Sequence, residues 1–254
     1  MQTQGNTIFI TGGGSGIGRG LCEAFHRLGN TVVVGGRSQA RLDETVAANP
    51  GMHAFALDVT DPDDIARAGR QLPERFPELN VLINNAGVMH YEDAIRDGAA
   101  IGERTVTTNL LGPIRTTAAL LPHLVQRDHA AILNVTSGLA FVPMAATPSY
   151  NASKAALHSY TVALREQLRE RGVQVLELIP PYVRTHLTGD AHASDQRAMP
   201  LDDYVRDTMA ILVEHPDRQE VVIDGVAPLR HAEANGTFDQ VFAMLADLGR
   251  ERAR

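Results

Sequence analysis

Two hydrophobic patterns alternate along the chain. One is a short run of apolar, often β-branched residues, and the other is a longer stretch in which apolar residues return every three to four positions. The short run is typical of a strand buried on both faces of a parallel sheet, and the longer pattern is typical of an amphipathic helix. The short runs occupy residues 7–10, 31–34, 53–57, 80–83, 130–135, 174–179 and 220–225. Their alternation with helical stretches predicts an α/β fold, a doubly wound parallel sheet of about seven strands with helices on both faces.

The boundaries of several helices can be predicted from single residues. Asn49-Pro50-Gly51 ends the second helix, and a third begins at Pro62, a residue suited to the first turn, with Thr60 or Asp61 as its cap. A long helix is expected from about residue 100 to residue 126, where six positions recur at helical spacing. These positions are Val106, Leu110, Ile114, Thr117, Leu121 and Leu124.

Pro113 lies inside this long helix and predicts a kink. It stands four residues after Asn109 and has no backbone N–H, so the Asn109 carbonyl loses its usual partner. A carbonyl freed in this way can hold a water molecule.

Length, charge and cysteine content narrow the class of protein. The chain has 254 residues, 44% of them hydrophobic, a formal net charge of −7 and one cysteine, Cys22. One domain over residues 1–254 is therefore expected, and the acidic balance argues against a nucleic-acid binder. A single cysteine, on the apolar face of the first helix, excludes an internal disulfide and indicates a buried thiol. No signal peptide pattern and no apolar run near 20 residues is present, so a cytoplasmic protein without a membrane span is expected.

A glycine-rich turn separates the first predicted strand from the first predicted helix. Its sequence is Thr11-Gly12-Gly13-Gly14-Ser15-Gly16-Ile17-Gly18. Gly12 permits a tight turn with positive φ, Gly16 a close approach to a ligand, and Gly18 close packing of the new helix. The free N–H groups at the start of that helix favour an anion such as a pyrophosphate. In this position the turn predicts a dinucleotide-binding site.

Two further motifs follow in order. Asn84-Asn85-Ala86-Gly87 comes directly after the fourth strand. After the fifth strand comes Ser137, and thirteen residues later Tyr150 and Lys154 stand at i and i+4, on one face of a helix. With the T-G-x-x-x-G-x-G turn, these motifs resemble the short-chain dehydrogenase/reductase family in its compact, single-domain branch. The tail, with an amphipathic helix around residues 238–248, resembles the subgroup around the oxidoreductase of D-alanyl lipoteichoic acid operons.

This resemblance implies an NADP-dependent oxidoreductase that interconverts a ketone or aldehyde and an alcohol by hydride transfer. It implies that Tyr150 is the general acid or base and that Ser137 hydrogen-bonds the substrate oxygen. Lys154 would bind the nicotinamide ribose and lower the pKa of Tyr150, while Asn109 would hold a water linking Lys154 to solvent. Asn84 would tie neighbouring strands together. The cofactor residues implied are Gly12, Gly14, Ser15, Gly16, Ile17, Gly18, Arg37, Ser38, Asp58, Val59, Asn85, Ala86, Gly87, Tyr150, Lys154, Pro180, Val183 and Thr185.

The end of the second strand predicts which cofactor is preferred. An acidic residue there binds the 2′-hydroxyl of NAD and repels a 2′-phosphate. Here the position holds Gly36, followed at once by Arg37. Glycine leaves room and a guanidinium can bind phosphate oxygens in bidentate fashion, so NADP (NADPH) is expected over NAD.

The segment after the sixth strand departs from the family. Pro180 is followed by Pro181-Tyr182, where the family usually has Pro-Gly, and this leaves the local backbone shape open. Residues 186–199 are polar and weakly periodic, and they resemble the family's mobile substrate lid. The long helices around Asn109 and Tyr150 resemble those that pair subunits in this family, so a homodimer or homotetramer is expected.

Two other functions remain open at this point. A non-catalytic dinucleotide sensor could use the same fold, although such proteins typically lose the Ser, Tyr or Lys that are all present here. A sugar-nucleotide epimerase would prefer another glycine spacing and a longer C-terminal domain. No metal site is predicted, because the ten histidines are scattered and His53, His123 and His158 are interpreted as surface or packing residues.

Overall fold

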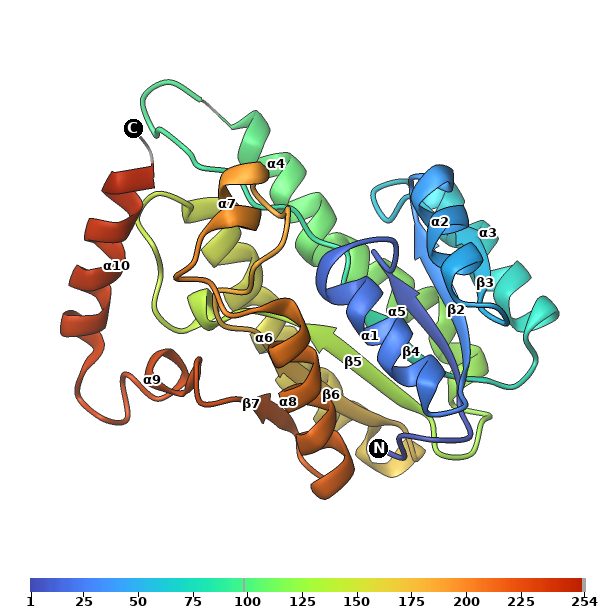
Figure 1. The fold of residues 1–254 in the computed structure, drawn as a ribbon. Coiled ribbons are helices and arrows are strands. Elements are labelled where there is room, and N and C mark those ends of the chain that lie inside the picture. The colour runs from blue at the N-terminus through green and yellow to red at the C-terminus, as the bar shows by residue number, and fades with distance from the viewer. Residues whose placement is uncertain (98, 253–254) are drawn as a thin grey trace.

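The computed structural model describes residues 1–97 and 99–252 and contains a seven-stranded sheet (Figure 1). Its strand order is β3-β2-β1-β4-β5-β6-β7, and every neighbouring pair is parallel. The predicted doubly wound parallel sheet is therefore confirmed. The strands are β1 (Thr7–Thr11), β2 (Thr31–Gly36), β3 (His53–Ala56), β4 (Leu79–Asn84), β5 (Ala131–Val135), β6 (Gln174–Ile179) and β7 (Glu220–Val222).

Helices cover both faces of the sheet, as the short apolar runs predict. Successive residues of β1 face opposite ways: Ile8 and Ile10 pack in one hydrophobic core and Phe9 in the other. The first core includes α1 (Gly16–Arg27) and α8 (Leu201–Glu214), and the second includes α3 (Pro62–Arg75), α5 (Gly112–Leu124) and α6 (Pro148–Leu168). The remaining α-helices are α2 (Gln39–Ala48), α4 (Ala100–Val106), α7 (Asp190–Ser194), α9 (Ala227–Arg230) and α10 (Phe238–Arg252).

Two local predictions are confirmed at helix α1 and helix α3. Cys22 is fully buried in the core between α1 and the sheet. Helix α3 begins at Pro62, and the Asp61 carboxylate accepts a hydrogen bond from the Asp63 N–H at 2.9 Å. The cap satisfies one of the donors that a helix N-terminus leaves without a partner.

The direction of the strand order changes between β1 and β4, because α3 carries the chain from β3 back across to β4. The loops at the carboxyl ends of β1 and β4 therefore diverge, which is where doubly wound folds bind ligands. Asn85 ties these loops together. Its backbone N–H bonds the Thr11 hydroxyl at 3.0 Å, and its side-chain amide bonds the Thr11 carbonyl at 3.0 Å.

The long helix predicted over residues 100–126 is interrupted at the predicted kink. Helices α4 and α5 are joined by a π-helical turn, η1 (Thr107–Leu111), which contains Asn109, and α5 ends at Leu124. The Gly112 N–H donates to the Thr107 carbonyl, five residues back. The next residue, Pro113, has no N–H to continue the α-helical ladder, which explains why the wider turn forms here.

Residues 186–199 contain α7 and are tied to the loop after β6. The ring of Tyr182 stacks on His192 with 4.6 Å between centroids, and its hydroxyl donates to Asp195. The buried His192 also bonds the Val183 carbonyl through Nε2 at 2.8 Å. Tyr182 does not take a positive φ, so its backbone does not need the glycine that the family usually has nearby.

Helix α10 lies at the end of the molecule away from α2 and α3 (Figure 1). It packs closely on the loop before α6, because a Cβ at Gly249 would lie 3.1 Å from the Ala146 Cβ. In the described part of the chain, no helix has the length and apolar character needed to cross a membrane.

Candidate active site

A cleft of about 870 Å³ opens at the carboxyl ends of the strands. Ser137 lines it together with every residue that the sequence assigns to the cofactor. Those residues are Gly12, Gly14, Ser15, Gly16, Ile17, Gly18, Arg37, Ser38, Asp58, Val59, Asn85, Ala86, Gly87, Tyr150, Lys154, Pro180, Val183 and Thr185. Asn109 does not line the cleft and is fully buried behind it.

The glycine turn forms a cradle that side chains would fill. Gly12 has a φ of +67°, and a Cβ there would lie 2.9 Å from the Ala86 Cα. A Cβ at Gly18 would lie 2.3 Å from both the Gly12 carbonyl oxygen and the Asn85 amide nitrogen. Gly18 therefore lies directly against the glycine turn and against the loop after β4. The side chain of Ser15, the N-cap of α1, makes no capping hydrogen bond. The first N–H groups of α1 and this hydroxyl together suit a phosphate.

At the other end of the cradle the cleft is lined by basic side chains. Arg37 is exposed, and within residues 1–97 and 99–252 its guanidinium has no hydrogen-bond or ion-pair partner. Asp58 is held in place, because its Oδ1 accepts bonds from the Thr60 N–H at 2.9 Å and the Thr60 hydroxyl at 2.7 Å. The sequence analysis missed Arg41, which also lines the cleft and whose Cβ would lie 3.2 Å from a Cβ at Gly14. Its place in the first turn of α2, a few residues after Arg37, was the available signal.

Ser137, Tyr150 and Lys154 come together where β5 ends and α6 begins. Tyr150 and Lys154 are 7% and 4% exposed and lie on one face of α6. Ser137 is hydrogen-bonded to the Tyr150 side chain. The Lys154 ammonium donates to the Val135 carbonyl at 2.7 Å and lies 5.8 Å from the centroid of the Tyr150 ring. A phenol, a hydroxyl and an ammonium are therefore gathered in one buried place, which suits proton transfer to or from a bound oxygen.

The electrostatics of this cluster differ from the expectation for Tyr150. Burial raises the pKa of the Tyr150 phenol, and the hydrogen bond from Ser137 offsets only part of this effect. Burial likewise lowers the pKa of Lys154 to about 8, against a raising effect of the Glu177 charge. The predicted lowering of the Tyr150 pKa by Lys154 is therefore not found, because burial is the larger effect and only the hydrogen bond with Ser137 acts against it.

Asn109 acts through its side chain on the loop after β4. Its Oδ1 accepts from the Val88 N–H at 2.8 Å, and its Nδ2 donates to the Val88 carbonyl at 2.9 Å and to the Ser153 hydroxyl at 3.1 Å. A Cβ at Gly87 would lie 3.4 Å from Asn109 Oδ1 and 3.7 Å from the Lys154 nitrogen. Asn109 thus joins η1, the loop after β4 and α6 next to Lys154.

Asn84 has the structural position that the sequence predicts for it. Its amide donates to Asn134 Oδ1 at 2.9 Å and to the Thr117 hydroxyl at 3.0 Å, so it joins β4 to β5 and α5. Asn134 in turn donates to the Thr161 hydroxyl at 2.9 Å.

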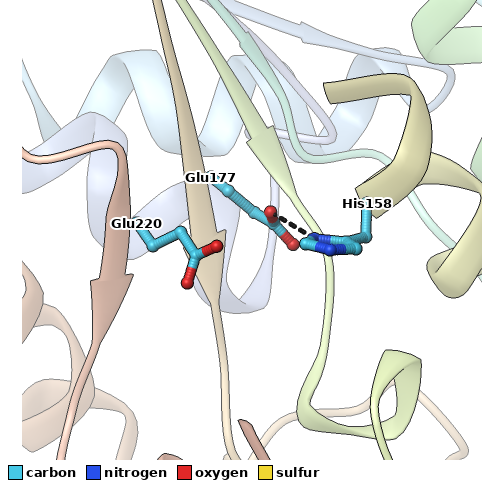
Figure 2. A group of neighbouring side chains, drawn as sticks. All are labelled: His158, Glu177 and Glu220. Atoms are coloured by element: carbon cyan, nitrogen blue, oxygen red, sulfur yellow. Dashed lines mark hydrogen bonds and ion pairs between the residues drawn. The ribbon is translucent and has the colours of Figure 1, made fainter. Parts of the chain in front are cut away.

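Behind the cluster lies a group of charged residues that the sequence analysis did not identify. His158 of α6 points at Glu177 of β6, with Nδ1 2.7 Å from the carboxylate, and Glu220 lies on the neighbouring strand (Figure 2). Glu177 is fully buried. His158 is half-buried and its ring packs on Phe141 with 4.8 Å between centroids, so it is a packing residue as interpreted, and it is also the partner of a buried carboxylate. A glutamate within an otherwise apolar strand was the signal.

Fold and site together define a dinucleotide-binding oxidoreductase architecture, and comparison with known proteins identifies the family. The short chain dehydrogenase family model matches residues 6–196. The chain belongs to the short-chain dehydrogenase/reductase family and is an oxidoreductase.

Relatives match over most of the chain. It is 36% identical to the oxidoreductase DltE of Bacillus subtilis over 96% of this chain and 98% of that one. It is 33% identical to the sulfoacetaldehyde reductase of Chromohalobacter salexigens over 87% of this chain and 88% of that one.

Solved structures share the fold. A short chain dehydrogenase from Burkholderia cenocepacia, in complex with NADP, superposes with a TM-score of 0.81 at 25% identity, over 96% of this chain and 99% of that one. A family member from Burkholderia phymatum, in complex with NAD, gives a TM-score of 0.81 at 23% identity over 94% and 96% of the two chains.

Proposed function

We propose that the protein is an NADP(H)-dependent oxidoreductase that interconverts a ketone or aldehyde and an alcohol. The observation that carries this proposal is the grouping of Ser137, Tyr150 and Lys154 at one end of the glycine-lined cleft. The rest of the cleft fits a dinucleotide: the glycine cradle leaves space for a pyrophosphate, and Arg37 has a guanidinium without a partner in the described residues. A nicotinamide bound in this cleft would supply or take up the hydride.

Each residue of the cluster has a separate role in this proposal. The Tyr150 hydroxyl gives its proton to the substrate oxygen during reduction and takes it back during oxidation. Ser137 donates a hydrogen bond to the same oxygen and so orients the carbonyl. Lys154, whose ammonium lies 5.8 Å from the centroid of the Tyr150 ring, binds the nicotinamide ribose. These roles rest on the hydrogen bond between Ser137 and Tyr150 and on the burial of Lys154 beside the Tyr150 ring.

The proposal is tested by measuring NADPH consumption with a panel of ketones and aldehydes, and NADP reduction with the matching alcohols. Turnover with at least one of them is expected. A protein that binds NADPH tightly but converts none of the panel would instead be the non-catalytic sensor.

The substrate end of the cleft favours neutral, apolar carbonyl compounds. Its lining next to Tyr150 comes mainly from apolar side chains of the loops after β4 and β5 and from α9 and α10: Met89, Leu139, Met144, Leu229, Met244, Leu245 and Leu248. Arg197 also lines the cleft, but its guanidinium is bound to the Asp195 carboxylate. The hydrogen bonds measure 3.1 Å from Nε and 3.0 Å from Nη2. An anionic substrate would therefore lose its hydration without gaining a dedicated cation.

This predicts that a medium-chain methyl ketone is a better substrate than the 2-oxo acid of matching length. We expect kcat/KM to differ by at least about tenfold, because an unpaired charge is costly to bury. Met244 is 57% exposed and lines the cleft. Replacing it with arginine should reduce the difference in kcat/KM between the ketone and the acid. A preference for the acid, or for sulfoacetaldehyde, that disappears in Arg197→Ala would show that Arg197 recognises an anion.

Pro113 gives a prediction about proton supply. We propose that the Asn109 carbonyl, which Pro113 cannot engage, holds a water that connects Lys154 to solvent. Pro113→Ala restores an N–H, and the variant should be no less stable, because proline is disfavoured by about 3 kcal/mol relative to alanine in a helix interior. NADPH affinity should be unchanged, while kcat in dilute buffer falls and small buffer acids restore part of it. A crystal structure with another protein donor on the Asn109 carbonyl, and no water there, would contradict this role.

We also propose that residues 1–254 act as one domain, that residues 186–199 close over the substrate, and that the α4–α6 region pairs subunits in a homodimer or homotetramer. Hydrogen exchange of residues 186–199 with and without NADPH tests the closure. Light scattering in solution tests the oligomeric state.

A further inference from the structure

Three consecutive residues at the carboxyl end of β5, Val135 to Ser137, each hold a different polar group of the site. The Val135 carbonyl accepts from Lys154, the Thr136 hydroxyl donates to Glu177 at 2.6 Å, and Ser137 is hydrogen-bonded to Tyr150. On α6 the corresponding residues are Tyr150, Lys154 and His158, spaced four apart and therefore on one face. The pair of Glu177 and His158 is thus the next layer of the same cluster, one helical turn beyond Lys154.

Glu177 is a carboxylate in the interior of the protein, where a charged group is costly. Its side chain is 0% exposed, in a strand whose neighbours are apolar, and burying such a group is costly unless it is hydrogen-bonded and paired. Both carboxylate oxygens are engaged: Oε1 by the Thr136 hydroxyl at 2.6 Å and Oε2 by His158 Nδ1 at 2.7 Å. Thr136 and His158 therefore hold the carboxylate in one orientation beside the site.

We propose that Glu177 is a positioning residue, a buried counter-ion that Thr136 and His158 hold in place for the Lys154 ammonium. The importance of Lys154 in this proposal rests on the proposed function. The electrostatic coupling between Glu177 and Lys154 does not depend on it.

The charges around Lys154 support this role. Burial lowers the pKa of Lys154 to about 8, and the Glu177 charge is what opposes that effect. Other charged groups also face Glu177: His158 and Arg165 on α6, Glu220 on β7 and Arg230 at the end of α9. His158 has a raised pKa because of its hydrogen bond to Glu177. Without Glu177, the neighbours that the described residues give this buried ammonium would be the Val135 carbonyl and the Tyr150 ring.

The same residues do not suit a metal ion. Ligand atoms of His158, Glu177 and Glu220 lie within 4.8 Å of one another (Figure 2). However, the Glu220 carboxylate accepts hydrogen bonds of 2.7 Å and 2.9 Å from the Arg230 guanidinium. His158 Nδ1 is already hydrogen-bonded to Glu177. A cation would have to displace Arg230, so the arrangement is explained by a network of paired charges.

The sequence allows a direct measurement, because Lys154 is the only lysine in the chain. Protein labelled with ¹³C at the lysine ε-carbon gives one lysine side-chain NMR signal, and its shift against pH reports the pKa of Lys154. In Glu177→Gln we expect that pKa to fall by about one unit, the scale of a unit charge a few ångströms away in a protein interior. The matched control is Glu220→Gln, the same change one strand away, which should shift it by less than about 0.3 unit.

An unpaired imidazolium could destabilise Glu177→Gln, so the double variant Glu177→Gln/His158→Gln is measured alongside it. The double variant keeps neutral hydrogen-bonding partners and should also lower the Lys154 pKa. An unchanged Lys154 titration in either folded variant, or an equal shift in Glu220→Gln, would overturn the proposal. In an active enzyme the alkaline limb of the kcat/KM profile should move to lower pH by the same amount. A wild type without activity would defeat the proposed function, yet leave the NMR result valid.

Discussion

Replacing Tyr150 with phenylalanine is expected to lower kcat roughly 10²- to 10⁴-fold, the usual contribution of a positioned proton donor. Tyr150 belongs to one hydrophobic cluster with Met89, Val142 and Met144, and phenylalanine keeps the apolar ring in that cluster. The lost group is the buried hydroxyl that is hydrogen-bonded to Ser137. The variant should therefore fold and bind NADPH with nearly unchanged affinity. Steady-state kinetics with the best substrate of the panel, together with NADPH fluorescence titration, measure both quantities.

Tyr160→Phe is the matched control for this prediction. Tyr160 lies on the same helix, is also partly buried, and has its hydroxyl hydrogen-bonded to Thr117 rather than to Ser137. Its loss should leave kcat within about twofold, the scale of a change outside the reacting groups. If Tyr150→Phe kept near wild-type turnover, or if both variants lost the same activity, Tyr150 would not be the proton donor.

Arg37→Ala should weaken NADPH binding roughly 10- to 100-fold, the scale of a charge-assisted hydrogen bond to a phosphate, and barely change NADH binding. The guanidinium lines the cleft and, in the part of the chain that the structure describes, has no partner to lose. Removing it should therefore leave the thermal stability unchanged. Dissociation constants of both cofactors, measured by fluorescence titration, test this expectation.

The reciprocal change is Gly36→Asp. A Cβ at Gly36 would meet only the Leu42 Cδ2 at 3.4 Å, so the fold should accept the aspartate. Its carboxylate should repel a 2′-phosphate and move the preference toward NADH. Arg70→Ala, on the surface of α3 and outside the cleft lining, is the control for a general loss of positive charge. Equal losses for NADPH and NADH in Arg37→Ala would mean that Arg37 does not recognise the phosphate. Arg41, one turn further along, would then be the next residue to replace.

Much of the fold follows from features that are local in the sequence. Seven short apolar runs separated by helical stretches determine the doubly wound sheet, because a run that is apolar on both faces needs helices on both sides. The glycine turn between β1 and α1 specifies where the chain turns closely from the sheet into the first helix, since only glycine fits at Gly12 and Gly18. The spacing of Tyr150 and Lys154 places both on one helical face, and Pro113 locates the interruption of the long helix.

The tertiary structure decided the properties that depend on residues far apart in the chain. The raised pKa of Tyr150 and the lowered pKa of Lys154 come from burial, and the cluster around Tyr150 joins residues as far apart as Met89 and Leu245, which no local pattern measures. The pairing of His158 with Glu177 joins residues 19 positions apart through the packing of α6 on β6. Sequence periodicity reports which way a side chain faces, but the electrostatic environment depends on what is packed against that face. The family and the position of the cleft were therefore predictable from the sequence, whereas the charge network behind Lys154 became visible only in the folded chain.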